Sequence, residues 1–183
     1  MQNKEIVDLI KGDFYRVYAD RLSMWKIVVI AISRFGRYPG WMLFFRYAQS
    51  DIKLVCIIAK IFLRVFSYLH CIDIPSCTKI GKGFYMGHGM CIVIHGGTQI
   101  GNNVNVSQFV NIGSNTSGFP VIGNNVYIGP HVSIVGNVTI GDNVTIGAGA
   151  VVVKDVPSEA TVVGVPAHVV NYDNPARYIC NRV

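Results

Sequence analysis

The sequence predicts a mainly β fold, a parallel β-helix of six-residue repeats preceded by a short α-helical N-terminal segment. The first observation behind this prediction is an aliphatic residue that opens each repeat and is usually followed by glycine. This first column comprises Ile100, Val106, Ile112, Ile122, Ile128, Ile134, Ile140, Ile146 and Val152. The second observation is another aliphatic column four residues further on, which comprises Val104, Val110, Val126, Val132, Val138, Val144, Ala150 and Val156.

A six-residue period fits neither the 3.6-residue period of an amphipathic helix nor the alternation of a half-buried strand. Short strands that turn tight corners and stack their aliphatic side chains on neighbouring coils account for it. Asparagine or glycine often stands between the two columns, where a corner needs a left-handed backbone. These corner positions are Asn103, Asn125, Asn137, Asn143 and Gly149. We therefore expect a β-helix domain over residues 71–170.

The repeat is interrupted twice. Ile112 and Ile122 are ten residues apart, so residues 114–121 must leave the coil as a loop, and loops on rigid scaffolds often carry function. Met86 and Ile94 are eight residues apart, and the segment between them contains His88 between two glycines. Both interruptions are candidate parts of a functional site.

Residues 1–70 are expected to form two or three helices, with a turn at residues 37–41, and residues 171–183 a C-terminal tail. Eleven of the sixteen Lys and Arg residues lie in residues 1–70, whereas the rest of the chain has equal numbers of basic and acidic residues. The solenoid therefore carries no basic groove, and we expect no nucleic-acid partner.

The five cysteines are odd in number and lack the spacing of metal sites, and the N-terminus does not resemble a secretion signal. We expect reduced thiols in a cytoplasmic protein. No stretch reaches the roughly 20 apolar residues that a membrane-spanning helix requires.

Residues 52–69 form an apolar segment in which Lys53, Lys60 and Arg64 fall within about 20° of one another on a helical wheel. A basic stripe beside apolar side chains suits peripheral contact with the inner membrane. The alternative is that the apolar face packs on the solenoid or on another subunit, with the stripe in solvent.

The first hypothesis about chemistry is that His88 is a general base and that Asp73 is its carboxylate partner. Gly87 and Gly89 leave the backbone around His88 open to a substrate. Asp73 precedes His88 by fifteen residues, which is nearly one coil of about eighteen, so its carboxylate can reach the imidazole. Such a carboxylate fixes the tautomer of a histidine and stabilises its imidazolium. Spacing alone also leaves a purely structural role for His88 open.

Several stretches resemble the active-site region of the serine acetyltransferases, within the hexapeptide-repeat acyltransferases. The resemblance covers residues 73–81, 83–94, 108–113, 122–129, 146–153 and 164–167. It implies a left-handed β-helix, a homotrimer with active sites between subunits, and acetyl-CoA as co-substrate; the unpaired spacing of the histidines separately predicts no metal. His88 then matches the catalytic base and Asp73 its partner. Gly129, Pro130 and Ala148 match the backbone beside the pantetheine arm, and Gly113 and the 114–121 loop match the cover of the site.

Three positions depart from the resemblance. Serine acetyltransferases place an aspartate before the catalytic histidine and an arginine-histidine pair before the loop proline, but this chain has Gly87, Gly118 and Phe119 there. Because an unpaired ammonium or carboxylate is costly to bury, these departures favour a neutral acceptor. They point to the branch that acetylates polysaccharides such as colanic acid, capsule and O-antigen.

The expected function is therefore acetyl transfer from acetyl-CoA to a hydroxyl of a sugar or polysaccharide precursor. Tyr85, Gly87, Asn115 and Phe119 would contact this sugar or glycan acceptor. The alternatives are a serine O-acetyltransferase and a non-catalytic β-helix scaffold. A zinc hydrolase built from histidines of the coils is disfavoured, because the histidines lack paired spacing.

Overall fold

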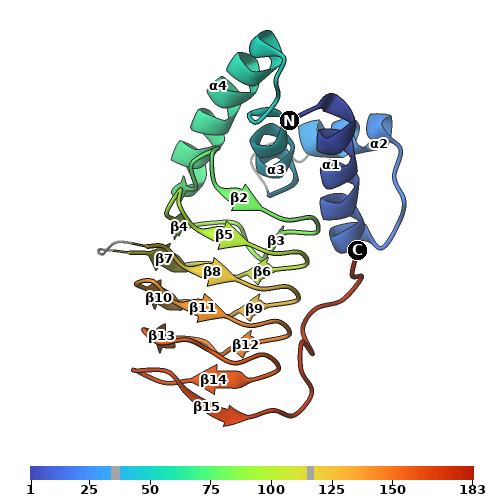
Figure 1. The fold of residues 1–183 in the computed structure, drawn as a ribbon. Helices are drawn as coiled ribbons and strands as arrows, with labels where there is room; N and C mark the ends of the chain where they lie inside the picture. The colour runs from blue at the N-terminus through green and yellow to red at the C-terminus, as the bar shows by residue number, and fades with distance from the viewer. Residues whose placement is uncertain (34–37, 115–117) are drawn as a thin grey trace.

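The computed structural model describes residues 1–33, 38–114 and 118–183 of the chain. Four helices stand at one end of a β-solenoid (Figure 1). They are α1 (Asn3–Tyr18), α2 (Met24–Ser33), α3 (Tyr38–Tyr47) and α4 (Lys53–His70). The helical N-terminal segment leads into the solenoid directly, because α4 ends at His70 and the first strand begins at Ile72.

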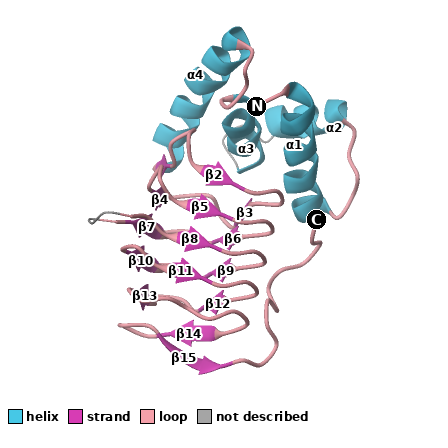
Figure 2. Cartoon of the chain, in the orientation of Figure 1, coloured by secondary structure: helices cyan, strands magenta, loops and turns pink. Residues whose placement is uncertain are grey.

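The solenoid has three sheets, and each of the first four coils contributes one short strand to each sheet (Figure 2). The first sheet contains β1 (Ile72–Asp73), β4 (Ile92–Ile94), β7 (Asn111–Gly113), β10 (Ser133–Val135) and β13 (Val151–Val152). The second contains β2 (Lys79–Ile80), β5 (Gln99–Ile100), β8 (Val121–Ile122) and β11 (Thr139–Ile140). The third contains β3 (Tyr85–Met86), β6 (Asn105–Val106), β9 (Tyr127–Ile128), β12 (Thr145–Ile146), β14 (Thr161–Val163) and β15 (His168–Asn171). All pairs are parallel except the last, so the predicted parallel β-helix is confirmed.

The pairing of the strands shows how many extra residues each interruption adds to its coil. An undisturbed coil advances eighteen residues, as between Ser133 and Val151. The coil that contains His88 advances twenty, from Ile72 to Ile92, and the coil that contains the 114–121 loop advances twenty-two, from Asn111 to Ser133. The extra residues therefore leave the coils without shifting the aliphatic columns.

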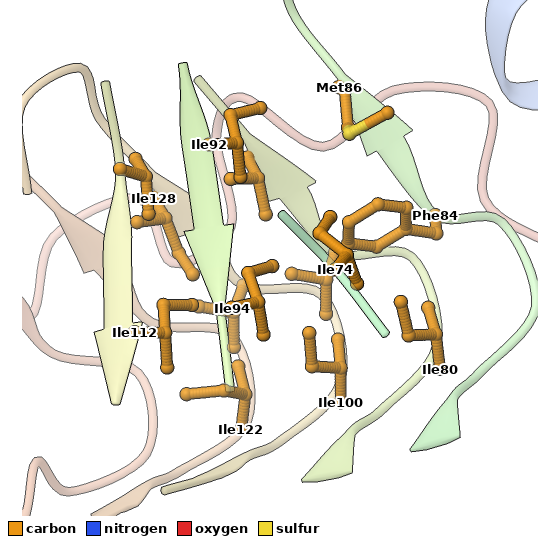
Figure 3. Close-up of a cluster of buried hydrophobic side chains, with 14 of the residues drawn as sticks. Ile74, Ile80, Phe84, Met86, Ile92, Ile94, Ile100, Ile112, Ile122 and Ile128 are labelled. Carbon is orange, nitrogen blue, oxygen red and sulfur yellow. The ribbon is translucent and has the colours of Figure 1, made fainter. Parts of the chain in front are cut away.

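The aliphatic columns form one continuous core. Isoleucines of successive coils lie on one another, as Ile80, Ile100 and Ile122 do in Figure 3. The second column is equally enclosed, since Val104, Val110 and several of its other members are completely buried. Full burial of such a side chain contributes about 1.5–3 kcal/mol, so stacking supplies the main stabilisation of the solenoid.

Left-handed corners occur at most of the predicted positions. Asn103, Asn125 and Asn143 have φ values of 56°, 55° and 59°. Their amides form a ladder, in which each asparagine donates to the next at 3.1 and 3.0 Å. The prediction for Asn137 was wrong, because the left-handed residue of that corner is Gly136, at φ 101°.

The predicted turn at residues 37–41 was also wrong over its described part, because α3 already begins at Tyr38. Pro39 lies in the first turn of this helix, where a missing N–H costs no intrahelical hydrogen bond. Arg37 lies outside the described residues. Trp41 and Phe45 are fully buried and stack at 4.9 Å, so α3 forms the centre of the helical cap.

The cap is fixed to the solenoid by a buried ion pair between α1 and α3. Arg46 Nε donates to Asp13 Oδ2 at 2.8 Å, and both side chains are 0% exposed. The two Nη groups of Arg46 donate to the carbonyl oxygens of Ile80 and Gly81 at 2.7 and 2.6 Å. These carbonyls belong to the first coil, where no preceding coil covers them. Arg46 therefore satisfies backbone groups at the open end of the solenoid.

Asp13 completes the same closure with its carboxylate. Its Oδ1 accepts hydrogen bonds from the N–H groups of Gly83 and Phe84 at 2.8 and 3.0 Å. Burial raises the pKa of this carboxyl, whereas Arg46 and the two N–H groups lower it. Neither Asp13 nor Arg46 stands out in the sequence, because both look like ordinary surface charges there.

Residues 172–183 run back along the solenoid from its last coil to the helical cap (Figure 1). The N–H of Ala176 donates to the carbonyl of Asn143 at 3.1 Å, and the Tyr178 ring lies 4.6 Å from that of Tyr127. At the far end, the N–H of Val183 donates to Asn103 Oδ1 at 2.9 Å. This segment, which we term the strap, therefore connects the coils along one edge.

The buried ion pair gives a direct test of how the cap is held. Arg46→Met should lower the free energy of unfolding by about 3–5 kcal/mol, because it leaves the buried Asp13 carboxylate without its counter-ion. Urea denaturation followed by circular dichroism measures this change.

The matched control is Lys82→Met, which removes the half-exposed partner of Asp8 at 2.9 Å. An exposed pair contributes about 0–1 kcal/mol, so this variant should unfold near the wild-type midpoint. Equal losses in the two variants would contradict a special role for the buried pair.

Candidate active site

His88 lies at the corner that connects β3 to β4. From Met86 to Val93 the chain takes seven residues, whereas the equivalent step in the next coil, from Val106 to Asn111, takes five. The two extra residues form a bulge in which His88 has φ 65° and Gly89 has φ 40°. His88 is exposed, whereas Gly89 is buried beneath it. The bulge therefore presents the imidazole outside the regular wall of the solenoid.

Asp73 lies on β1, the strand next to β4, and pairs in register with Val93. The Asp73 side chain is exposed on the outer face of the first sheet, which the chain enters at β4 directly after the His88 corner. Within the described part of the chain, no hydrogen bond joins Asp73 to His88. The fold thus puts both residues on neighbouring segments of the first coil and leaves their side chains in solvent.

Three further candidate residues lie along the same edge of the solenoid. Gly129 and Pro130 follow β9, and Ala148 occupies the equivalent corner of the next coil. The coils are close here, since a Cβ on Gly129 would lie 2.8 Å from the backbone nitrogen of Ala148. Pro130 has no N–H to offer a ligand, but its carbonyl accepts a hydrogen bond from Gly149 at 2.9 Å. The corners of successive coils from His88 to Ala148 are thus stacked on one another and form one edge of the solenoid.

Gly113 ends β7 at the opposite side of the same sheet, next to His95 of the preceding coil and Val135 of the following one. A Cβ on Gly113 would meet no atom within 4 Å, so the surface there is open. The 114–121 loop starts directly after it. Asn115 falls outside the described residues.

Phe119 does not present a free aromatic face. Its ring stacks on the imidazole of His95, with 4.5 Å between centroids and 13° between planes. It also covers Gly97, where a Cβ would lie 2.4 Å from the ring. His95 Nδ1 accepts a hydrogen bond from the N–H of Gly97 at 3.0 Å, which holds the imidazole in place. In the sequence, His95 stood out only as one of the coil histidines considered for zinc, whereas in the structure it anchors the loop through Phe119.

Within one chain, Phe119 and His88 do not meet. His88 precedes β4, whereas His95 and Phe119 lie at the end of β4. The described residues of one chain therefore place the base and the loop at opposite ends of the same strand.

Tyr85 and Gly87 stand immediately before the His88 bulge. Tyr85 is half-buried on β3. A Cβ on Gly87 would meet only Tyr85 Cε1, at 3.7 Å, which is an ordinary van der Waals contact. The position next to His88 therefore has room for a side chain.

The histidines of the coils do not converge. His131 stacks on Phe109 at 4.6 Å, and His95 stacks on Phe119. Over residues 1–33, 38–114 and 118–183, no three His, Cys, Asp or Glu side chains are grouped to hold a metal ion. Burial and the neighbouring Cys71 thiol raise the pKa of Cys91, which favours the protonated thiol at this corner.

Comparison with known proteins gives consistent matches. Residues 119–154 match the family model described as bacterial transferase hexapeptide (six repeats). The serine acetyltransferase of Bacillus pumilus is 31% identical over 166 residues, which cover 88% of this chain and 76% of that protein. The serine acetyltransferase of Staphylococcus xylosus is 38% identical over 121 residues, 64% of this chain. This chain spans only 56% of the length of the Staphylococcus protein.

Solved structures agree with the sequence matches. The crystal structure of Neisseria gonorrhoeae serine acetyltransferase superposes with a TM-score of 0.73 at 28% identity, covering 92% of this chain and 67% of that chain. A serine acetyltransferase in complex with CoA superposes with a TM-score of 0.68 at 27% identity, covering 92% and 70%. These matches include the helical cap as well as the coils, and they confirm the left-handed hexapeptide-repeat β-helix.

The assignment to the polysaccharide branch, and with it the sugar acceptor, was wrong. It depended on three positions, Gly87, Gly118 and Phe119, whereas the 31–38% identical relatives are serine acetyltransferases. Local charge at a site changes more easily than the core that specifies coils and cap, so the longer match decides the family. The chain belongs to the serine acetyltransferase family of hexapeptide-repeat transferases.

Proposed function

We propose that this chain transfers the acetyl group of acetyl-CoA to the hydroxyl of L-serine. The observation that carries the proposal is the family match over 166 residues, which includes the His88 bulge and the coils beside it. One relative of this family has been solved in complex with CoA, which supports acetyl-CoA as the donor.

In the proposed reaction, His88 acts as general base. Its imidazole takes the proton of the acceptor hydroxyl as the oxygen attacks the thioester carbonyl carbon. The tetrahedral intermediate then expels the thiolate of coenzyme A, which receives the proton from the imidazolium. Asp73, on the neighbouring strand, would stabilise that imidazolium and fix the tautomer, as carboxylates do for catalytic histidines.

We further propose that the active site forms in a homotrimer. The His88 edge and the 114–121 loop lie at opposite ends of β4 in one chain. A neighbouring subunit packed on this sheet would bring its own loop towards the His88 edge. In such a site, the stacked corners that contain Gly129, Pro130 and Ala148 would lie beside acetyl-CoA.

The proposed base can be tested by substitution. His88→Ala should reduce kcat on the order of a hundredfold or more, because the acceptor hydroxyl loses its base. Asp73→Asn should have a smaller effect. Thiol release from acetyl-CoA in the presence of L-serine measures both.

Size-exclusion chromatography and CoA binding serve as controls, and both should match the wild type in these variants. Wild-type turnover by His88→Ala would exclude the general-base role. Absence of thiol release by the wild-type protein with L-serine would contradict the proposed function itself.

The open space at Gly87 allows a second test, of amino-acid recognition. Gly87→Asp would put a carboxylate next to His88, where it can hold the ammonium of serine, and should lower KM for L-serine on the order of tenfold. Steady-state kinetics at saturating acetyl-CoA measures the change.

Gly87→Asn is the matched control, because it has the same size without the charge. If both variants lower KM equally, the effect is not electrostatic. A KM for L-serine that rises in Gly87→Asp would show that the acceptor binds elsewhere.

We also propose a peripheral membrane contact through α4, one face of which is largely exposed among the described residues. Ala59, Leu63 and Phe66 pack inward. A wide apolar face remains exposed, from Leu54 at 68% to Tyr68 at 85%; its members are Leu54, Ile57, Ile58, Ile61, Phe62, Val65, Tyr68 and Leu69. Lys53, Lys60 and Arg64 border it, and α4 contains no acidic residue. This charge complements an anionic lipid surface. None of the helices in residues 1–33, 38–114 and 118–183 has the length and hydropathy of a bilayer-spanning segment.

Sedimentation with vesicles tests this contact. The wild-type protein should sediment with vesicles that contain anionic phosphatidylglycerol and much less with neutral ones. Charge reversal at Lys53, Lys60 and Arg64 should abolish sedimentation, whereas reversal at the exposed Lys26, Lys79 and Lys154 should not. Wild-type protein that stays in the supernatant, or equal loss in both triple variants, would rule the contact out.

A further inference from the structure

A pocket of about 470 Å³ lies where the helical cap, the first coil and the strap meet. One face of α1 forms its floor, through Gly12 and Tyr15, and Leu22 adds an apolar wall. Lys82, from the corner between β2 and β3, closes another side, and the end of the strap a third. The volume falls in the range of small-molecule sites. It is separated from the His88 corner by β3, so it is not part of the proposed active site.

Basic side chains outnumber acidic ones around this pocket. Lys11, Arg21, Lys82 and Arg182 line it, and Asp8 is the only acidic side chain among its lining residues. Asp8 is paired with Lys82 Nζ at 2.9 and 3.0 Å. Among the described residues, Lys11 and Arg21 have no ion pair or hydrogen bond through their side chains. Among the described residues, these two cations therefore have no side-chain counter-ion at the pocket.

Packing holds two of the cations in place. The stem of Lys82 crosses α1 at Gly12, where a Cβ would lie 2.4 Å from Lys82 Cγ. Glycine inside a helix costs about 0.5–1 kcal/mol relative to alanine, and the crossing lysine explains why it stands here. Arg182 donates through Nε and Nη2 to the carbonyls of Ile179 and Ala176, at 3.3 and 3.4 Å. These bonds orient its guanidinium on the strap.

We propose that this pocket binds a small molecule that carries phosphate groups. Guanidinium groups bind phosphate oxygens in a bidentate manner, and lysines add point charges around them. The Tyr15 ring and Leu22 offer an apolar surface to the remainder of the ligand. Because α1, the first coil and the strap all contribute cations, the ligand connects three segments that are far apart in the sequence. Binding therefore stabilises the attachment of the cap to the solenoid.

Isothermal titration calorimetry with pyrophosphate as the probe tests the proposal. The wild-type protein should bind one equivalent per chain, and saturating pyrophosphate should raise Tm. Lys11→Gln combined with Arg21→Gln should weaken binding at least tenfold and remove the Tm shift. Lys4→Gln combined with Lys26→Gln is the matched control, because it removes the same charge from exposed positions outside the pocket.

Two further titrations separate this site from other sources of anion binding. Pyrophosphate should still bind when CoA is saturating, since the proposed donor site lies on another edge. Citrate should bind much more weakly than pyrophosphate. The proposal is overturned if wild-type protein does not bind pyrophosphate, if both double variants lose equal affinity, if CoA displaces the probe, or if citrate binds as well. None of these outcomes depends on acetyl transfer.

Discussion

The buried pair of Asp13 and Arg46 is the interaction on which the arrangement of this protein depends. A β-helix is regular along its axis, but its first coil has backbone groups that no earlier coil can pair. Arg46 donates to the carbonyls of Ile80 and Gly81, and Asp13 accepts from the N–H groups of Gly83 and Phe84. Each charge neutralises the other in a site that excludes water. The helical cap is therefore a structural end of the solenoid rather than an appended domain.

The same regularity explains where chemistry can occur. Aliphatic columns keep their register whether a coil advances eighteen, twenty or twenty-two residues, so extra residues are displaced outward at corners. His88 occupies the smaller displacement, and the loop with Phe119 the larger. A rigid core thus carries two irregular segments, and neither disturbs the other. In the proposed trimer, their separation along β4 would place the histidine of one subunit towards the loop of its neighbour.

The uncharged residues at three site positions and the overall family match led to different predictions for the acceptor of the acetyl group. The uncharged positions Gly87, Gly118 and Phe119 suggested a neutral substrate, whereas coils and cap together match serine acetyltransferases. Core residues specify the family because many must agree at once, and a site is altered by a few substitutions. The stacking of Phe119 on His95 also shows that an aromatic residue in a loop can serve the scaffold.

The sequence by itself determined the β-helix, its two interruptions and most left-handed corners, because a six-residue period has only one regular solution. It also indicated that His88 lies outside the core, since a histidine between glycines interrupts the repeat there, and the side chain is exposed in the structure. Only the tertiary structure showed the Asp13–Arg46 pair, the His95–Phe119 stack and the cationic pocket beside Lys82. Each of these joins residues that are distant in the chain and individually look like ordinary surface positions. Their meaning comes from which backbone or side chain lies opposite, and a local pattern does not encode that.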